Sequence, residues 1–157
     1  MSSINVYQAT IFDLELLVPL FDGYRQFLGC KSDQDAARSF LRNRLNHGES
    51  TLFIALDQKT PIGFAQLYPT FSSLSLARTF VMNDVFVLPD SRRRGAALRL
   101  MTAAVDYAAA VGAEKISLDI ASSNHPAQAL YACTGWSVEE NSLPYYFMVP
   151  ELSEALA

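Results

Sequence analysis

The sequence predicts a single α/β domain over residues 1–157, with a mixed sheet flanked by helices. Three observations predict it. Two helical patterns precede a strand hairpin, a long apolar strand enters another helix through a basic loop, and a strand, a helix and two more strands follow. The expected order is β-α-α-β-β-β-α-β-α-β-β. Half of the residues are hydrophobic, and a chain of this size typically buries about 70% of its unfolded surface, which suits one core.

The first predicted elements are a short strand and a helix. Ile4–Ala9 alternates loosely between apolar and polar residues, and Thr10 is placed to cap a helix that begins at Ile11. Pro19 lies inside the helical pattern, so the sequence allows either one kinked helix or two shorter helices.

A second helix follows a turn. Ser32 and Asp35 have the spacing of a capping box, and apolar residues at helical spacing continue to Asn46–Gly48. Tyr24 and Phe27, just before the turn, are candidate substrate-binding residues, with packing in the core as the alternative.

Two strands and an aromatic segment form the middle of the chain. The polar turn Asp57–Thr60 separates Thr51–Leu56 from Pro61–Leu67, which predicts an antiparallel hairpin. The segment Tyr68–Ser75 contains Pro69, which argues against a regular central strand, so we expect a loop or a strand end. Tyr68 is a further candidate substrate-binding residue.

The residues from Ala77 to Leu88 predict a long strand with two polar residues, Asn83 and Asp84, at its centre. A polar group inside an apolar strand is costly unless it is paired, so these residues indicate either a functional site or a structural hydrogen bond. Because side chains alternate along a strand, the two are expected on opposite faces of the sheet.

The stretch Val85–Met101 predicts a strand, a cationic loop and a helix N-terminus. Such a terminus leaves backbone N–H groups free to bind an anion. Small residues let the backbone approach a ligand, and arginines add positive charge. The predicted anion cradle consists of Arg92, Arg93, Arg94, Gly95, Ala96 and Ala97. It favours a phosphorylated cofactor, and the alternative is a solvated basic turn. Neither G-x-G-x-x-G nor G-x-x-x-x-G-K-[ST] is present.

The rest of the chain predicts a helix up to Val111–Gly112, a strand at Lys115–Ile120, a helix from Pro126 or Ala127 to Cys133, and two closing strands. The closing strands are expected near Ser137–Glu139 and Tyr145–Val149.

Composition excludes several classes of protein. The formal charge of −4 argues against a nucleic-acid surface. Cys30 and Cys133 form neither a metal motif nor a disulfide framework, which favours a reducing compartment. The N-terminus lacks the pattern of a signal peptide, and no apolar run reaches the roughly 18 residues that span a bilayer. A cytoplasmic protein without metal is expected.

Two motifs resemble those of one enzyme superfamily. The first is R-x-x-G-x-A at Arg92, Gly95 and Ala97, preceded by V-x-P at residues 87–89. The second is N-x-x-A-x-x-L-Y-x-x-x-G-[FW], at Asn124, Ala127, Leu130, Tyr131, Gly135 and Trp136. Together, in this order, they resemble the GNAT N-acetyltransferases over roughly residues 51–149. The segment M-N-D-V-F-V is most similar to the polyamine and histone-type branch.

The resemblance implies direct transfer of acetyl from acetyl-CoA to an amine, with the cofactor held in a splay between the strands of Val85 and Ile116. It implies that backbone groups of Phe86 and Val87 bind the pantetheine arm and that the Arg92–Ala97 loop holds the pyrophosphate. It also implies that Asn124 binds the cofactor arm and that Tyr131 is the general acid for the leaving thiolate.

The general base is left open. Similar polyamine-type enzymes have Glu-Asp where this chain has Asn83 and Asp84, and asparagine cannot accept the proton. Asp84 acting through water, Asn83 ordering that water, or another carboxylate are the alternatives. His47 and His125 are further alternatives, because histidine is a common general base, but we interpret both as incidental.

The leading hypothesis is an acetyl-CoA-dependent N-acetyltransferase that acts on a polyamine, an amino acid, an aminoglycoside, or a protein lysine or N-terminus. The alternatives are an acyl-CoA-binding sensor without catalysis and a partner-binding domain without cofactor. The expected assembly is a homodimer, because family members often pair through their last strands. No nucleic-acid or membrane partner is expected.

Overall fold

The computed structural model describes residues 3–152. It contains two compact units, one ending at Asp119 and one beginning at Ile120, which are described separately. Among residues 3–152, no helix is long and apolar enough to cross a membrane.

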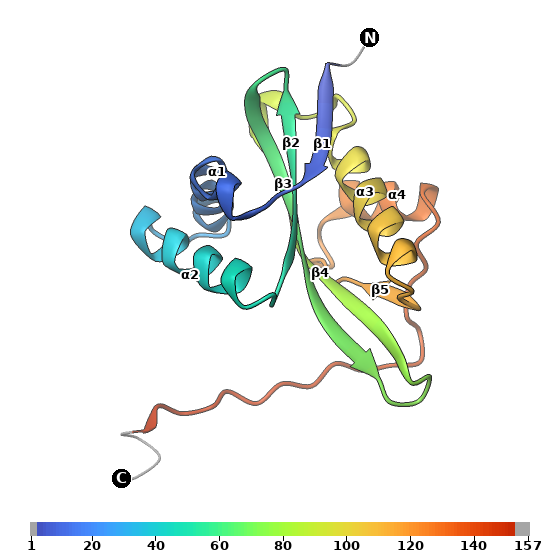
Figure 1. Cartoon of the computed structure of the whole chain (residues 1–157). Coiled ribbons are helices and arrows are strands. Elements are labelled where there is room, and N and C mark those ends of the chain that lie inside the picture. The colour runs from blue at the N-terminus through green and yellow to red at the C-terminus, as the bar shows by residue number, and fades with distance from the viewer. Residues whose placement is uncertain (1–2, 153–157) are drawn as a thin grey trace. The chain divides into compact units, whose positions relative to one another are not determined.

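The first unit is built on a five-stranded sheet whose strands follow the chain order (Figure 1). Neighbouring strands from β1 to β4 are antiparallel, and β5 is parallel to β4. The sheet is therefore mixed, as predicted. The strands are β1 (Ile4–Gln8), β2 (Thr51–Asp57), β3 (Thr60–Ser72), β4 (Ala77–Val87) and β5 (Lys115–Ser117).

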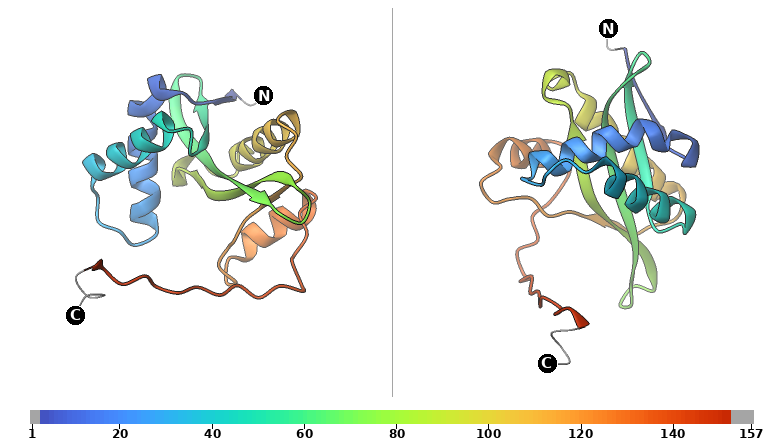
Figure 2. Two further views of the ribbon diagram at one scale, coloured as in Figure 1. Left: turned by 60° about the horizontal axis from the view of Figure 1, so that its bottom comes forward. Right: turned by 90° about the vertical axis from the view of Figure 1, so that its left-hand side faces the viewer.

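Helices cover both faces of this sheet. α1 (Leu14–Phe27) and α2 (Gln34–Asn46) lie on one face, and α3 (Ala96–Ala110) lies on the other (Figure 2). Leu17 of α1, Leu41 of α2 and Phe64 of β3 are fully buried on the first face. Leu100 of α3 is fully buried on the second face. Each such side chain contributes roughly 1.5–3 kcal/mol by leaving water.

The expected cap of the first helix is confirmed. The Thr10 hydroxyl accepts a hydrogen bond from the Phe12 N–H at 3.3 Å, and Asp13 accepts one from the Thr10 N–H at 2.8 Å. A 3₁₀ turn, η1 (Ile11–Asp13), leads into α1. α1 is one helix through Pro19, which lies on its exposed side, so the missing N–H is on the face that water reaches.

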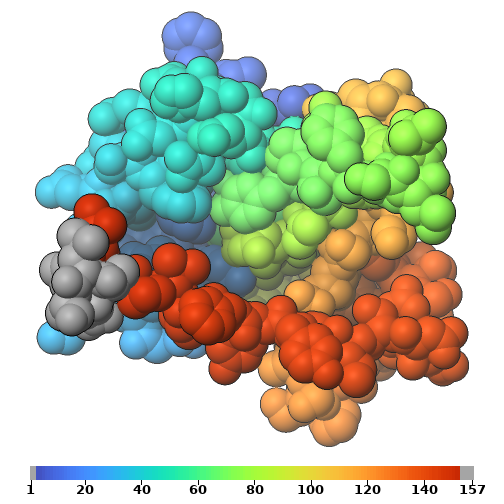
Figure 3. Space-filling view, turned by 90° about the horizontal axis from the view of Figure 1, so that it is seen from below, coloured from blue at the N-terminus to red at the C-terminus, as the bar shows by residue number. Residues whose placement is uncertain are grey.

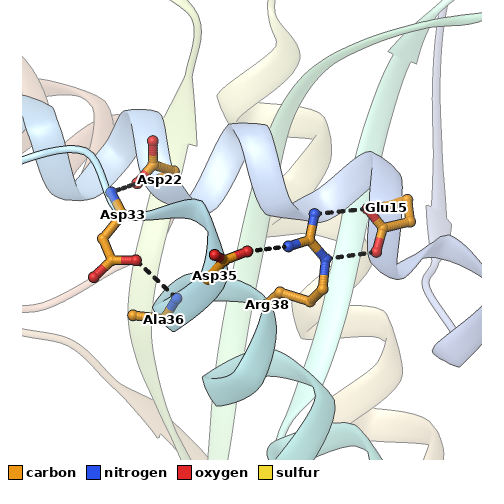
Figure 4. Close-up of polar contacts among 6 residues, drawn as sticks. All are labelled: Glu15, Asp22, Asp33, Asp35, Ala36 and Arg38. Atoms are coloured by element: carbon orange, nitrogen blue, oxygen red, sulfur yellow. Dashed lines mark hydrogen bonds and ion pairs between the residues drawn. The ribbon is translucent and has the colours of Figure 1, made fainter.

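The second helix is not capped as predicted. The capping residue is Asp33, whose Oδ1 accepts a hydrogen bond from the Ala36 N–H at 3.0 Å (Figure 4). The Ser32 hydroxyl instead donates to Oδ2 of Asp22 at 2.8 Å. The Ser32 hydroxyl is therefore bound to the buried Asp22 carboxylate and does not cap the helix.

The strand β3 continues through Pro69 to Ser72, so of the two alternatives for Tyr68–Ser75 the structure shows the strand end. Pro69 pairs with Phe80 of β4. Pairing of β3 with β2 ends at Leu67, so the other edge of β3 is open beyond that point. Proline is tolerated on an open edge because no ladder hydrogen bond is lost there.

The second unit contains α4 (His125–Cys133) followed by an extended chain. The predicted strands at Ser137–Glu139 and Tyr145–Val149 are wrong, because the described part of this unit contains no strand. A strand needs a hydrogen-bonding partner, and neither segment has one within its own unit. The side chains of Tyr145–Val149 are 78–90% exposed along the orange-red chain in Figure 3.

Candidate active site

The central feature of the site is a β-bulge in β4. Gln66 of β3 pairs with Asp84, but Leu67 pairs with Met82, so Asn83 is an extra residue in β4. Phe80 packs against Tyr107 of α3, whereas Phe86 packs against Tyr24 of α1 on the opposite face. Phe80 and Phe86 are separated by an even number of positions, so in an uninterrupted strand both side chains would lie on one face. The bulge reverses the side-chain alternation of β4, as bulges near active sites do.

Because of the bulge, Asn83 and Asp84 line the same pocket. The expectation that they face opposite sides of the sheet is wrong, since it assumed an uninterrupted strand. The pocket has a volume of about 450 Å³ and lies between α1, α2, the loop that joins them, β3 and β4. Its lining residues are Phe21, Tyr24, Arg25, Leu28, Cys30, Ala36, Ala37, Phe40, Tyr68, Asn83 and Asp84.

Asp84 is held by two amide groups. Its side chain is 3% exposed, its Oδ2 accepts a hydrogen bond from Gln66 Nε2 at 2.6 Å, and its Oδ1 accepts one from Asn83 Nδ2 at 2.9 Å. A carboxylate has about four lone-pair sites, so both oxygens keep capacity for another donor. This arrangement can bind a cationic amine or receive its proton.

Tyr68 stands beside this carboxylate in the pocket, where sequence analysis expected a substrate-binding residue. Burial, and then the negative charge of Asp84, raise the pKa of Tyr68 to about 12. Its phenol is therefore protonated at neutral pH and can donate a hydrogen bond. Tyr24 also lines the pocket, with its ring centroid 5.7 Å from those of both Phe64 and Phe86.

Phe27, the third predicted substrate-binding residue, does not line this pocket. Its side chain is 65% exposed, and the Arg92 guanidinium lies 5.1 Å from its ring centroid. Arg92 Nε also donates to the carbonyl of Val87 at 2.9 Å. Phe27 and Arg92 together cover the end of β4.

One edge of β4 is open beside the bulge. β5 pairs with β4 only at Thr79–Val81, so among the described residues no strand pairs with this edge from Met82 to Val87. This is the splay that the resemblance implied. The edge includes Phe86 and Val87, the predicted contacts of the cofactor arm.

The N-terminus of α3 provides an anion cradle. Gly95 has a left-handed φ of +81°, which favours glycine, and a Cβ built there would meet open space. The N–H groups of Ala96, Ala97 and Leu98 have no hydrogen-bond acceptor among residues 3–152. These unpaired donors and the open backbone fit a phosphate group.

The three arginines before the cradle differ in their surroundings. Arg92 binds Val87 as described, and Arg94 forms an ion pair with Asp57 at 2.8 Å. Hydrogen bonding to Arg94 lowers the pKa of Asp57, and the same bond raises that of Arg94. Arg93 is exposed, has a positive φ of 62°, and has no polar partner within the described chain. It is the arginine available to a ligand.

The second predicted motif lies in the other unit. Asn124 caps α4, because its Oδ1 accepts a hydrogen bond from the Ala127 N–H at 3.2 Å. The ring of Tyr131 lies 5.8 Å from that of Trp136, and burial raises the pKa of the Tyr131 phenol above 10.0. Tyr131 is therefore protonated at neutral pH, as a proton donor must be.

The remaining candidates lie outside the pocket lining. His47 ends α2 with a ring nitrogen 2.7 Å from the Asn43 carbonyl, and His125 begins α4. Gln66, Arg25 and Cys30 were not among the site residues predicted from the sequence. Gln66 could have been found, because it is a polar residue within the apolar run of Ile62–Leu67. No three His, Cys, Asp or Glu side chains in residues 3–152 group as metal ligands would.

The fold and this site define a class of protein. A mixed sheet opened along one strand, a helix N-terminus with unpaired N–H groups and a separate pocket with a buried carboxylate are the parts of a group-transfer enzyme with a phosphorylated co-substrate.

Comparison with known proteins identifies the family. Residues 17–136 match the model of the acetyltransferase (GNAT) family. The chain is 41% identical over 146 residues to the uncharacterized N-acetyltransferase YhfO of Bacillus subtilis strain 168, covering 93% of this chain and 98% of that protein. The chain therefore belongs to the GNAT family and is an acetyltransferase. This family uses acetyl-CoA.

Solved structures agree in fold. A crystal structure of "a probable acetyltransferase" has a TM-score of 0.88 at 35% identity, covering 94% of this chain and 99% of that one. An aminoglycoside N-acetyltransferase, AAC(6')-Iy in complex with CoA, has a TM-score of 0.75 at 23% identity, covering 93% and 95%. The second likeness shows the fold alone.

Proposed function

We propose that this protein transfers an acetyl group from acetyl-CoA to a primary amine that enters the pocket of Asp84. The acceptors to be considered are polyamines, amino acids, aminoglycosides and protein lysines or N-termini. The observation that carries the proposal is the bulge, because it turns the Asp84 carboxylate into a pocket next to an open strand edge.

Several groups of this chain would hold acetyl-CoA. The cradle N–H groups of Ala96, Ala97 and Leu98 suit the pyrophosphate, and the exposed Arg93 adds positive charge. The open edge of β4 suits the amide groups of the pantetheine arm. When bound, acetyl-CoA supplies an activated thioester carbonyl. Asn124 stays a predicted ligand through its amide Nδ2, since its Oδ1 already caps α4.

Asp84 is the best-supported base. An ammonium that enters the pocket gives up a proton to Asp84, directly or through a water molecule, and the neutral amine then forms the new C–N bond as the C–S bond breaks. Asn83 and Gln66 orient the carboxylate by their hydrogen bonds, so asparagine at position 83 has a positioning role. General-base catalysis of this kind typically contributes 10²–10⁴-fold.

Tyr131 is the proposed general acid. The departing CoA thiolate would receive the phenolic proton, and the second proton, which the nitrogen loses after the C–N bond forms, would restore the phenol; the first proton is the one that Asp84 accepts. Burial raises the pKa of Tyr131, and this keeps the phenol protonated until the thiolate forms.

A sensor that binds acyl-CoA without catalysis is the second candidate, favoured by asparagine at position 83 where similar enzymes have glutamate. Measuring free CoA release across a panel of amines, together with calorimetric binding of acetyl-CoA, separates the two. CoA release that depends on an amine supports the enzyme. Tight binding with no release for any amine supports the sensor, and no binding overturns both.

A further inference from the structure

The charged residues that line the pocket have opposite signs. Only Asp84 and Arg25 carry a formal charge among its lining residues. Asp84 comes from the bulge of β4 and Arg25 from α1, where Phe21, Tyr24 and Arg25 form one wall together with Leu28, the residue that follows the helix. The other lining residues are aromatic, apolar or neutral polar. A ligand that fills this pocket meets one anion and one cation.

Arg25 has no ion-pair partner within residues 3–152. Arg38, Arg44 and Arg94 all pair with a carboxylate, but Arg25 does not pair with Asp84 or with any other acid of the described chain. The closest acid on its own helix, Asp22, has its two oxygens occupied by three donors: Gln26, Ser32 and the backbone N–H of Asp33. Arg25 therefore lines the pocket, partly buried, without any carboxylate of residues 3–152 in ion-pair contact, while the charge of Asp22 acts on it only from a longer distance.

A second cation near the pocket, Arg44, is already neutralised. Arg44 is close enough to influence Tyr68, but it forms an ion pair with Glu49 at 3.0 Å and lies over the ring of Phe40. Arg25, which forms no ion pair within residues 3–152, is therefore the feature that distinguishes this pocket from one built for a polycation. A polyamine or an aminoglycoside brings several positive charges, and Arg25 would repel one of them.

We infer that the acceptor is a small amine that also carries a carboxylate, such as a free amino acid, with its ammonium at Asp84 and its carboxylate at Arg25. This inference rests on the proposed function and narrows its substrate class. Guanidinium binds carboxylate through two parallel hydrogen bonds, which suits recognition of such a group. The volume of about 450 Å³ is toward the lower end of the roughly 300–1,000 Å³ of small-molecule sites.

The test compares matched acceptors that differ only in the carboxylate. Free CoA release is measured for several neutral L-amino acids and for the carboxamide of each. We expect the ratio of kcat/KM for acid over amide to fall by at least about tenfold in Arg25→Gln, because the charge-assisted hydrogen bonds to the carboxylate are lost. The change in this ratio is the decisive quantity, because the basicity difference between the two amines is the same for both proteins.

Arg42→Gln is the matched control. Arg42 is an exposed arginine of α2 outside the pocket lining, so the same substitution there leaves the ratio unchanged. Arg25→Lys keeps the positive charge but lacks the planar guanidinium, so we expect it to retain part of the preference for the acid over the amide. Equal ratios in wild type and Arg25→Gln, or acetylation of polyamines or aminoglycosides but of no amino acid, overturn the inference.

A binding measurement separates this inference from the proposed function. Cys30 is exposed and lines the same pocket, and Cys133→Ser leaves it as the single thiol of the chain. We expect an amino acid to slow alkylation of Cys30 by N-ethylmaleimide more than its carboxamide does, and Arg25→Gln to remove this difference. If no amine is acetylated but this protection is seen, the proposed function fails, while the part of the inference that assigns binding of an amino-acid carboxylate to Arg25 holds. If amines are acetylated but the protection and the ratio do not depend on Arg25, only the inference fails.

Discussion

Gln66 of β3 donates a hydrogen bond of 2.6 Å to the carboxylate of Asp84, its pairing partner in β4. Gln66 is fully buried and Asp84 is 3% exposed, so the bond lies where water does not compete. Gln66 and Asp84 form the pair next to the bulge, where the register between β3 and β4 shifts. The same irregularity that brings Asp84 into the pocket thus also supplies the amide that fixes it. Asp84 is therefore positioned by the sheet itself and not by a mobile loop.

Asp84→Asn is expected to lower kcat by about 10²–10⁴-fold while acetyl-CoA affinity stays within about twofold. Asparagine keeps the size of the side chain and an oxygen for Gln66, but it cannot accept the proton of the ammonium. Steady-state kinetics and calorimetry measure the two quantities.

Asp106→Asn is the control for this change, because Asp106 is an exposed acid of α3. It is expected to leave kcat unchanged. A kcat within threefold of wild type for Asp84→Asn would remove Asp84 as the base and direct attention to a different carboxylate.

Gly95→Ala is expected to weaken acetyl-CoA binding. Gly95 has φ of +81° at the start of α3, and a non-glycine residue in this conformation costs roughly 1–2 kcal/mol. The added Cβ also projects into the open space of the cradle.

Gly112→Ala separates strain from binding. Gly112, just beyond the other end of α3, has φ of +77° and equally open space, so both variants lose similar stability. Isothermal titration with acetyl-CoA should show weaker binding for Gly95→Ala alone. Equal affinities for the two variants would argue against the cradle.

Tyr131→Phe is expected to lower kcat with little change in acetyl-CoA affinity, because a proton donor to the leaving thiolate stabilises the transition state and not the ground state. Tyr145→Phe, which removes the hydroxyl of an exposed tyrosine, provides the comparison. Unchanged turnover in Tyr131→Phe would exclude the role of general acid.

Local signals in the sequence predicted most of the elements of the first unit. The Thr10 cap, the hairpin turn after Asp57 and the glycine before α3 each act through neighbouring residues, so their effect can be read along the chain. The sequence left open whether Pro69 lies in a loop or a strand end, because that depends on where the adjacent strand β2 ends, which is a property of the whole sheet.

The site was less predictable for the same reason. Asn83 and Asp84 stand out as polar residues in an apolar strand, but the bulge that turns both into one pocket requires the register with β3. Arg25 appears in the sequence as an ordinary polar residue of a helix. Its proposed role in binding depends on its place in the pocket lining and on the absence of an ion-pair partner among the described residues. Both are defined only by the three-dimensional arrangement.

The last prediction concerns the buried Asp22, which joins α1 to the loop before α2. It is 2% exposed and accepts hydrogen bonds from the Asp33 N–H at 2.8 Å, the Ser32 hydroxyl at 2.8 Å and the Gln26 amide at 2.9 Å. The backbone N–H of Asp33 is the largest cause that lowers the pKa of Asp22 below 3.8. The stabilisation is therefore fully present above the unfolded pKa of about 3.9 and is lost as the pH falls through the lower folded pKa.

Asp22→Asn is expected to lower the free energy of unfolding at pH 7 by roughly 2–3 kcal/mol. The reason is that the NH2 group of asparagine would face donors that now bind a carboxylate oxygen, and those donors would lose their acceptor. The difference from wild type should shrink as the pH is lowered below about 4, because wild type then loses the same interactions. Urea unfolding at several pH values between 3 and 7 measures both effects. Asp35→Asn removes an exposed partner of Arg38 and should change stability little at any of these pH values (Figure 4). A destabilisation by Asp22→Asn that is equally large at pH 3 and pH 7 would show that the charge of Asp22 is not what holds this loop.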